Sequence, residues 1–109
     1  MEEYLASLLE KIDIPAYYVT RKNSQKFPYI IYDFIESPHG NSDDEEEITN
    51  YEFFFNIYAG NDVIDIKRKL MKLLKENDFQ KKIVPIPMYY DDLECFEQAL
   101  QYSKVVDYN

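Results

Sequence analysis

Residues 51–58 are the feature that most constrains the fold of this chain. Aromatic and β-branched residues dominate the segment, and the large apolar side chains of one parity are Tyr51, Phe53, Phe55 and Ile57. Neighbouring side chains of a strand point to opposite faces, so Glu52 and Asn56 lie on the other face. The pattern predicts a β-strand with one face in a hydrophobic core.

An amphipathic helix is predicted directly after this strand. A turn at residues 59–61 precedes it, and Asn61 or Asp62 can accept hydrogen bonds from free N–H groups of the first helical turn. Apolar residues recur at helical spacing at Val63, Ile66, Leu70, Leu73 and Leu74. The opposite side carries Arg68, Lys72 and Lys75. We expect this helix to pack on the sheet and to turn a basic face toward solvent or an acidic partner.

The first part of the chain predicts a short helix and two strands. Leu5, Leu8, Leu9 and Ile12 have helical spacing, and the helix is expected to end before Pro15. Residues 16–19 and 27–34 then have the composition of strands, and the polar residues 21–26 between them predict a turn. The two strands are therefore expected to form a hairpin.

An acidic loop is predicted at about residues 36–50. Its centre has five like charges in a row, Asp43, Asp44, Glu45, Glu46 and Glu47. Such a run repels itself, so it should stay solvated in a loop.

The last part of the chain predicts further strands. Residues 83–90 are strand-like, but Pro85 and Pro87 share a parity and lack N–H groups, a pattern tolerated at a sheet edge. Residues 95–106 fit either a helix or a strand, and the β-branched pair Val105 and Val106 favours the strand. The expected fold is α+β, with a single mixed or antiparallel sheet of about four to five strands and two helices on one face.

Length and charge limit the classes of function. A chain of 109 residues is the size of one domain, so we expect residues 1–109 to form a single unit. The net charge of -9 argues against a general binder of nucleic acids or anionic membranes. We expect a soluble protein, because the sequence has no long apolar run. We expect it in the reducing cytoplasm, because it has a single cysteine and no signal-peptide pattern at Met1.

No pattern in the sequence predicts catalysis. His39 is the only histidine and has no second histidine or nearby cysteine with which to bind a transition metal. Cys95 has no basic neighbour that would lower its pKa, so a buried thiol is the expectation. The acidic run lacks the glycine and final glutamate of a calcium-binding EF-hand loop, and glycine-rich phosphate loops are missing. We expect a protein that is not an enzyme and that has no cofactor or metal.

Two short phrases and the order of elements resemble a known family. The phrases are Ile-Pro-Ala-Tyr-Tyr at residues 14–18 and Phe-Pro-Tyr-Ile-Ile-Tyr at residues 27–32. With a short first helix, an acidic excursion, an aromatic strand, a charged helix and a tyrosine-rich tail, they resemble the tail-terminator (tail-completion, or head-tail joining) proteins of long-tailed phages and prophages of Gram-positive bacteria. The resemblance covers almost the whole chain.

The resemblance implies a structural virion protein. Such a subunit forms a ring, typically a hexamer, that caps the tail tube, ends tail polymerisation and offers a docking face to the head connector. The implied partners are other copies of the chain, the tail tube protein and the head connector, and DNA passes through the ring without specific binding. The implied location is the phage tail, assembled in the cytoplasm of the bacterial host.

The sequence also predicts which residues contact a neighbouring subunit. Phe54 and Tyr58 lie on the strand parity opposite the core, where either another subunit or a second helix would cover them. Arg68, Lys72 and Lys75 are expected to meet acidic surface of an adjacent subunit, with residues 43–47 as its source. The acidic charge is compatible with a ring lumen that DNA passes, and also with ordinary solubility.

Two other functions fit an acidic domain of this size. One is an inhibitor that imitates DNA, which would need carboxylates in rows at phosphate-like spacing, and the clearest acidic cluster here is one loop. The other is a small adaptor whose acidic loop binds a basic partner. The mass of the native particle separates these from a terminator, because a closed ring contains several copies.

Overall fold

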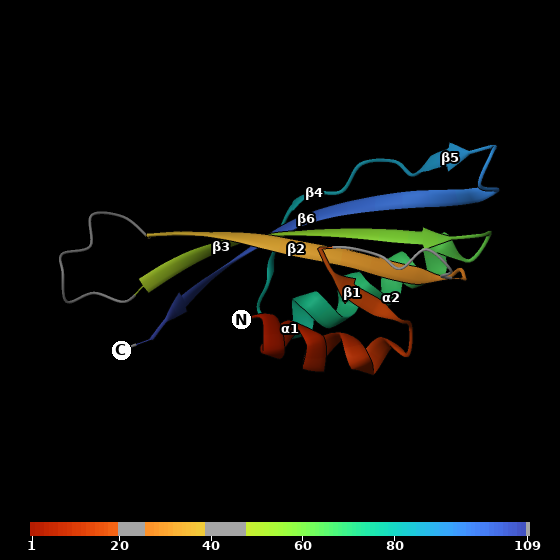
Figure 1. The fold of residues 1–109 in the computed structure, drawn as a ribbon. Helices are drawn as coiled ribbons and strands as arrows, with labels where there is room; N and C mark the ends of the chain where they lie inside the picture. The colour runs from red at the N-terminus through yellow and green to blue at the C-terminus, as the bar shows by residue number, and fades with distance from the viewer. Residues whose placement is uncertain (20–25, 39–47, 109) are drawn as a thin grey trace.

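A twisted sheet with both helices on one of its faces forms the described part of the chain (Figure 1). The computed structural model describes residues 1–19, 26–38 and 48–108. The helices are α1 (Glu2–Leu9), continued by the 3-10 turn η1 (Glu10–Ile12), and α2 (Val63–Glu76). The strands are β1 (Ala16–Tyr18), β2 (Tyr29–Pro38), β3 (Ile48–Ala59), β4 (Gln80–Ile83), β5 (Met88–Tyr90) and β6 (Cys95–Asp107). The α+β class is confirmed, with one strand more than predicted.

Long antiparallel pairs make the centre of the sheet. The strand order is β1-β2-β3-β6-β4, and β5 pairs with the start of β6. β3 pairs with β2 from Tyr58 to Thr49 and with β6 from Ala59 to Ile48. Residues 51–58 therefore lie in the central strand, as their apolar pattern predicts, because a central strand is the one most enclosed by neighbours.

The predicted hairpin between the first two strands is wrong. β1 runs parallel to β2, with Ala16 opposite Ile30 and Tyr18 opposite Tyr32. A parallel pair requires the chain to return along the length of the first strand, which is only about 10 Å for a strand of three residues. Ten residues, 19–28, connect the two strands, which is enough for that return. The polar composition of residues 21–26 therefore predicted a turn but not the direction of β2 relative to β1.

The predicted acidic loop is shorter than expected. β2 continues through Pro38 and β3 begins at Ile48, so both ends of the range 36–50 belong to the ladder. Backbone hydrogen bonds hold these strand ends although Glu36 and Ser37 are exposed, and polarity alone therefore misplaced the strand boundaries. The five acidic residues 43–47 lie outside the described residues.

The predicted strand at residues 83–90 is two short strands. β4 begins earlier, at Gln80, and β5 begins at Met88, so Pro85 and Pro87 lie between them. A proline cannot donate to a ladder, which explains the gap. The ambiguous segment after Glu94 is β6, so the strand interpretation is confirmed.

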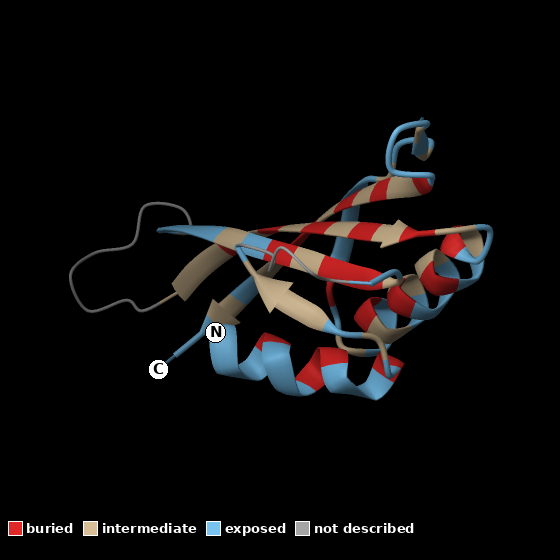
Figure 2. Cartoon of the chain, turned by 45° about the vertical axis from the view of Figure 1, so that its right-hand side comes forward, coloured by how far each residue is buried: buried red, intermediate tan, exposed pale blue. Residues whose placement is uncertain are grey.

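Buried side chains of both helices and of one face of β3 form one core. Leu5, Leu8 and Leu9 of α1 cluster with Val63, Ile66, Leu70 and Leu74 of α2, and with Tyr51, Phe53, Phe55 and Ile57. Figure 2 shows buried and half-buried residues alternating along β3. Each fully buried aliphatic side chain contributes about 1.5 to 3 kcal/mol to folding. The predicted core is confirmed, apart from Leu73, which is half-buried.

The ends of α2 differ in how their backbone groups are satisfied. Asp62 is the N-cap residue, but its side chain makes no capping hydrogen bond, and the N–H of Val63 donates to the Gly60 carbonyl instead. At the other end, the Asn77 amide donates to the Leu73 carbonyl at 2.8 Å. Asp78 then takes a left-handed conformation with φ 64°, and the Phe79 N–H donates back to the Leu74 carbonyl. The helix therefore ends at Glu76, with Asn77 as its C-cap residue.

Neither helix of the described residues is long and apolar enough to cross a membrane.

Candidate subunit interface

The helix-free face of the sheet carries Phe54 and Tyr58. Both are half-buried, and neither belongs to the core cluster. In register, Phe54 lies between Asp33 and Gln101, and Tyr58 lies between Tyr29 and Glu97. Both helices of the described residues pack on the opposite face (Figure 1), so within that part of the chain the alternative that a second helix covers Phe54 and Tyr58 is wrong.

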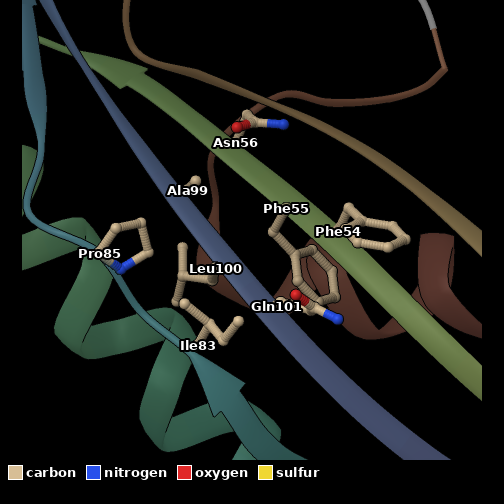
Figure 3. Close-up of a pocket in the computed structure, with 8 residues that line it drawn as sticks. All are labelled: Phe54, Phe55, Asn56, Ile83, Pro85, Ala99, Leu100 and Gln101. Carbon is tan, nitrogen blue, oxygen red and sulfur yellow. The ribbon is translucent and has the colours of Figure 1, made fainter.

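A small hollow lies beside Phe54 on this part of the sheet. Figure 3 shows Phe54 on β3, Ala99 and Gln101 on β6, and Ile83 and Pro85 on the segment that flanks β6. The volume is ≈ 180 Å³. Sites for drug-sized ligands occupy about 300 to 1,000 Å³, so this hollow is too small for such a ligand and has room for one side chain of a protein partner.

A hydrogen-bonded carboxylate links the aromatic side chains at the end of this face. The Tyr58 hydroxyl donates to Glu97 Oε2 at 2.7 Å, and the Tyr90 hydroxyl donates to Glu97 Oε1 at 2.6 Å. The Tyr29 ring stacks on Tyr58 at 5.0 Å and on Phe27 at 5.6 Å between centroids. Because both carboxylate oxygens have a donor, the charge of Glu97 is stabilised without a cation.

Burial and the neighbouring carboxylate raise the pKa of Tyr58. Burial is the larger cause, and the hydrogen bond to Glu97 follows. For Tyr90 the hydrogen bond to Glu97 is the main cause of a raised pKa. Both phenols therefore stay protonated donors at neutral pH, which is opposite to the change that would activate a tyrosine as a base or nucleophile.

We expect this cluster to make the fold sensitive to alkaline pH. The folded-state pKa of Tyr58 lies above the unfolded value, so its contribution is full below about pH 10 and is lost as pH rises through the folded-state pKa. Replacing Tyr58 with phenylalanine should cost about 1 to 2 kcal/mol at pH 7, because one hydrogen bond to a charged group is lost. Urea unfolding at pH 7 and pH 11 measures both effects. A difference between parent and variant that stays constant over this range would contradict the role of the Tyr58 hydroxyl.

Exposed apolar side chains concentrate between residues 83 and 93. We call them the apolar strip, and they are Ile83, Ile86, Met88, Tyr89 and Leu93. Ile86 is the extreme case, with 85% of its surface exposed. Large apolar side chains grouped in one segment are typical of a surface that another protein covers.

The predicted basic face of α2 is on the surface. Arg68, Lys72 and Lys75 are all exposed, and none of them forms an ion pair with a carboxylate of the residues that the structure describes. Their predicted partner, residues 43–47, lies outside that part of the chain. The contact between these two groups therefore stays a prediction.

The candidates for chemistry lack supporting geometry. Cys95 is fully buried at the start of β6, and His39 lies outside the described residues. Within the described ranges, no group of three or more His, Cys, Asp or Glu side chains could hold a metal ion. The structure brings together Tyr58, Tyr90 and Glu97 instead.

Sequence reasoning missed Tyr90 and Glu97. They meet because β5 and β6 pair as a hairpin, with Met88 opposite Glu97 and Tyr90 opposite Cys95. The signal was available in Asp91, Asp92 and Glu94, three of the four residues after Tyr90, because these acidic residues separate two strand-like runs.

A bacteriophage protein has the same fold as this chain. It is the gp17 protein of bacteriophage SPP1, whose solved structure superposes with a TM-score of 0.56 over 99% of this chain and 89% of that chain. The two sequences are 12% identical over the match, so the likeness establishes the fold alone. No protein-family model matches the chain. No curated protein matches it in sequence.

Proposed function

We propose that this chain is a tail-terminator protein of a long-tailed phage or prophage of a Gram-positive bacterium. The observation that carries the proposal is the fold, which is that of a bacteriophage protein over nearly the whole chain. The phrases at residues 14–18 and 27–32 support it, because they resemble this family in the strands β1 and β2. In this role the protein caps the tail tube, ends its polymerisation and forms the joint to the head connector.

Unpartnered surfaces support a role as an assembly subunit. The helix-free face presents Phe54 and a hollow sized for a side chain, and the apolar strip is exposed on the segment from β4 to β6. A subunit of a ring contacts two neighbours and further proteins above and below, so it needs several such surfaces. In a monomer that acted alone, these apolar side chains would stay exposed to water, which is unfavourable.

The charge distribution fits a ring through which DNA passes. The net charge of -9 disfavours adhesion to phosphates, while the exposed Arg68, Lys72 and Lys75 supply a local basic surface for a neighbouring acidic subunit. In this proposal the chain forms a hexameric ring and has the tail tube protein and the head connector as partners. The ring assembles in the host cytoplasm and is then incorporated into the virion.

The described surface favours this role over a DNA mimic or an acidic adaptor. A mimic needs free carboxylates over its whole binding face. Here Glu97 accepts hydrogen bonds from two tyrosine hydroxyls, and α2 presents basic residues. The apolar strip has no counterpart in the recognition of a basic groove.

Native mass spectrometry and tail assembly together test the proposal. We expect the purified protein, with or without tail tube protein, to form a closed ring of several copies. In cells that produce the parent phage without this protein, tails should be of irregular length and fail to join heads, and expression of the chain should restore both. Tails of normal length that join heads in its absence would overturn the proposal.

A further inference from the structure

A hollow rimmed by lysines lies between α2 and the strands β4 and β6. Its volume is ≈ 510 Å³, and its lining is Met71, Lys72, Lys75, Phe79, Lys81 and Tyr102. Phe79 and Tyr102 are almost fully buried and form an apolar floor with the half-buried Met71, whereas the three lysines are exposed at the rim. We call this feature the lysine hollow.

The three rim lysines have no partner within the part of the chain that the structure describes. No ion pair joins Lys72, Lys75 or Lys81 to a described carboxylate, although the protein has 21 acidic residues. Lys104, next to the hollow, differs, because its Nζ donates to the Asn77 carbonyl at 2.6 Å and lies 5.0 Å from the Phe79 ring centre. Like charges around one hollow repel each other, and an acidic partner would remove that cost.

The complementary surface lies on the turn between β5 and β6. This turn, which we call the acidic turn, consists of Asp91, Asp92, Leu93 and Glu94. All four residues are exposed, and Leu93 has 44% of its surface in contact with water. Three carboxylates around one leucine are the counterpart of three ammonium groups around an apolar floor.

The acidic turn cannot reach the lysine hollow of its own chain. β6 begins at Cys95, directly after the turn, and Tyr102 on the floor of the hollow is in the same strand. The strand rise places the two residues about 23 Å apart. Figure 1 shows the β5–β6 turn at the far right end of the sheet and the start of β4 near its middle. The two surfaces can therefore meet only between different copies of the chain.

We propose that the acidic turn of one copy docks in the lysine hollow of the next copy. Leu93 lies against Phe79 and Tyr102, and the carboxylates of Asp91, Asp92 and Glu94 face the ammonium groups of Lys72, Lys75 and Lys81. Each copy uses different surfaces toward its two neighbours, so the contact is head-to-tail and generates a ring when the rotation closes. The inference deepens the proposed function and rests on it for closure of the ring.

This contact assigns the sequence-predicted basic face a different partner. Lys72 and Lys75 remain in the interface, Lys81 joins them, and Arg68 does not line the hollow. The acidic partner is the turn at residues 91–94 in place of residues 43–47. The leucine between the carboxylates supplies apolar contact area, which a run of five charges lacks.

Reciprocal charge reversal tests the contact. One variant carries Lys72→Glu, Lys75→Glu and Lys81→Glu, and the other carries Asp91→Lys, Asp92→Lys and Glu94→Lys. We expect self-association of each variant alone to weaken about 10- to 100-fold in sedimentation velocity at 50 mM salt, and an equimolar mixture to recover the parental association within about threefold. Recovery requires that each variant provides the surface that the other lacks.

The matched control replaces Asp43, Asp44 and Glu45 with lysine. It changes the net charge by as much as the acidic-turn variant does, but at the partner that the sequence predicted. On its own this control should associate like the parent, because it keeps both the lysine hollow and the acidic turn. The proposal is overturned if this control alone loses association while the acidic-turn variant associates like the parent, if each reversal variant associates like the parent, if the equimolar mixture of the two reversal variants does not recover association, or if the parent stays monomeric up to its solubility limit. Thermal unfolding confirms that each variant is folded. A mixture that recovers association but does not cap tails would overturn the proposed function and leave the contact standing.

Discussion

Replacing Phe53 with alanine is expected to destabilise the protein by about 3 to 5 kcal/mol, the loss typical of a buried phenylalanine. Phe53 has no exposed surface and lies at the centre of the core. Its ring packs against Phe79 at 4.9 Å, and against Tyr51 and Phe34 at 5.8 and 6.0 Å between centroids. Neighbours on three sides cannot all move inward, so the substitution leaves a cavity.

The adjacent Phe54 is a matched control for this prediction. It is the same residue type in the same strand, but its side chain lies on the helix-free face and is half-buried. Phe54→Ala should cost about 1 kcal/mol or less in an isolated subunit. Urea unfolding of both variants measures the difference, and equal losses would contradict the assignment of the two faces.

Replacing Phe54 with aspartate is expected to abolish assembly while the subunit stays folded. If a neighbouring copy or tail protein covers this face, the new carboxylate is buried without a partner, next to Asp33. The association constant should fall at least about 100-fold, which corresponds to about 2.7 kcal/mol. Native mass spectrometry of the purified variant, and the length of tails formed in its presence, measure this effect.

Phe54→Leu is the control for the aspartate variant. Leucine keeps the apolar character of the site, so association should stay within about tenfold of the parent. Thermal unfolding of the two variants separates loss of assembly from loss of fold. Full assembly of the aspartate variant would place Phe54 outside the interface and would leave the hollow beside it unoccupied in the particle.

Local patterns in the sequence determined the elements and their buried faces. The alternation of Tyr51, Phe53 and Phe55 identified the core face of the central strand, because a strand has a side-chain period of two and one face must leave water. The spacing of Val63, Ile66 and Leu70 identified the buried side of α2 for the same reason at the helical period. The exposed positions of Arg68, Lys72 and Lys75 followed directly.

The sequence was less informative where the polarity of side chains and the pairing of the backbone differ. Glu36 and Ser37 are exposed and polar, yet the ladder with β3 includes them. Conversely, the apolar run through Pro85 and Pro87 has no strand at the prolines, because their missing N–H groups interrupt pairing. Side-chain composition reports burial, and only hydrogen bonding along the backbone defines a strand.

The sequence by itself determined the α+β class, the central strand and the helix that packs on it, since each of these depends on residues close together in the chain. The tertiary structure alone decided the parallel direction of β1, the meeting of Tyr58 and Tyr90 on Glu97, and the lysine hollow formed by α2 with Lys81 and Tyr102. Tyr58 and Glu97 are 39 residues apart in the sequence, and Tyr102 is likewise distant from α2, so the positions of these features follow from which strands pair and in which direction they run. Local periodicity carries no information about those two choices.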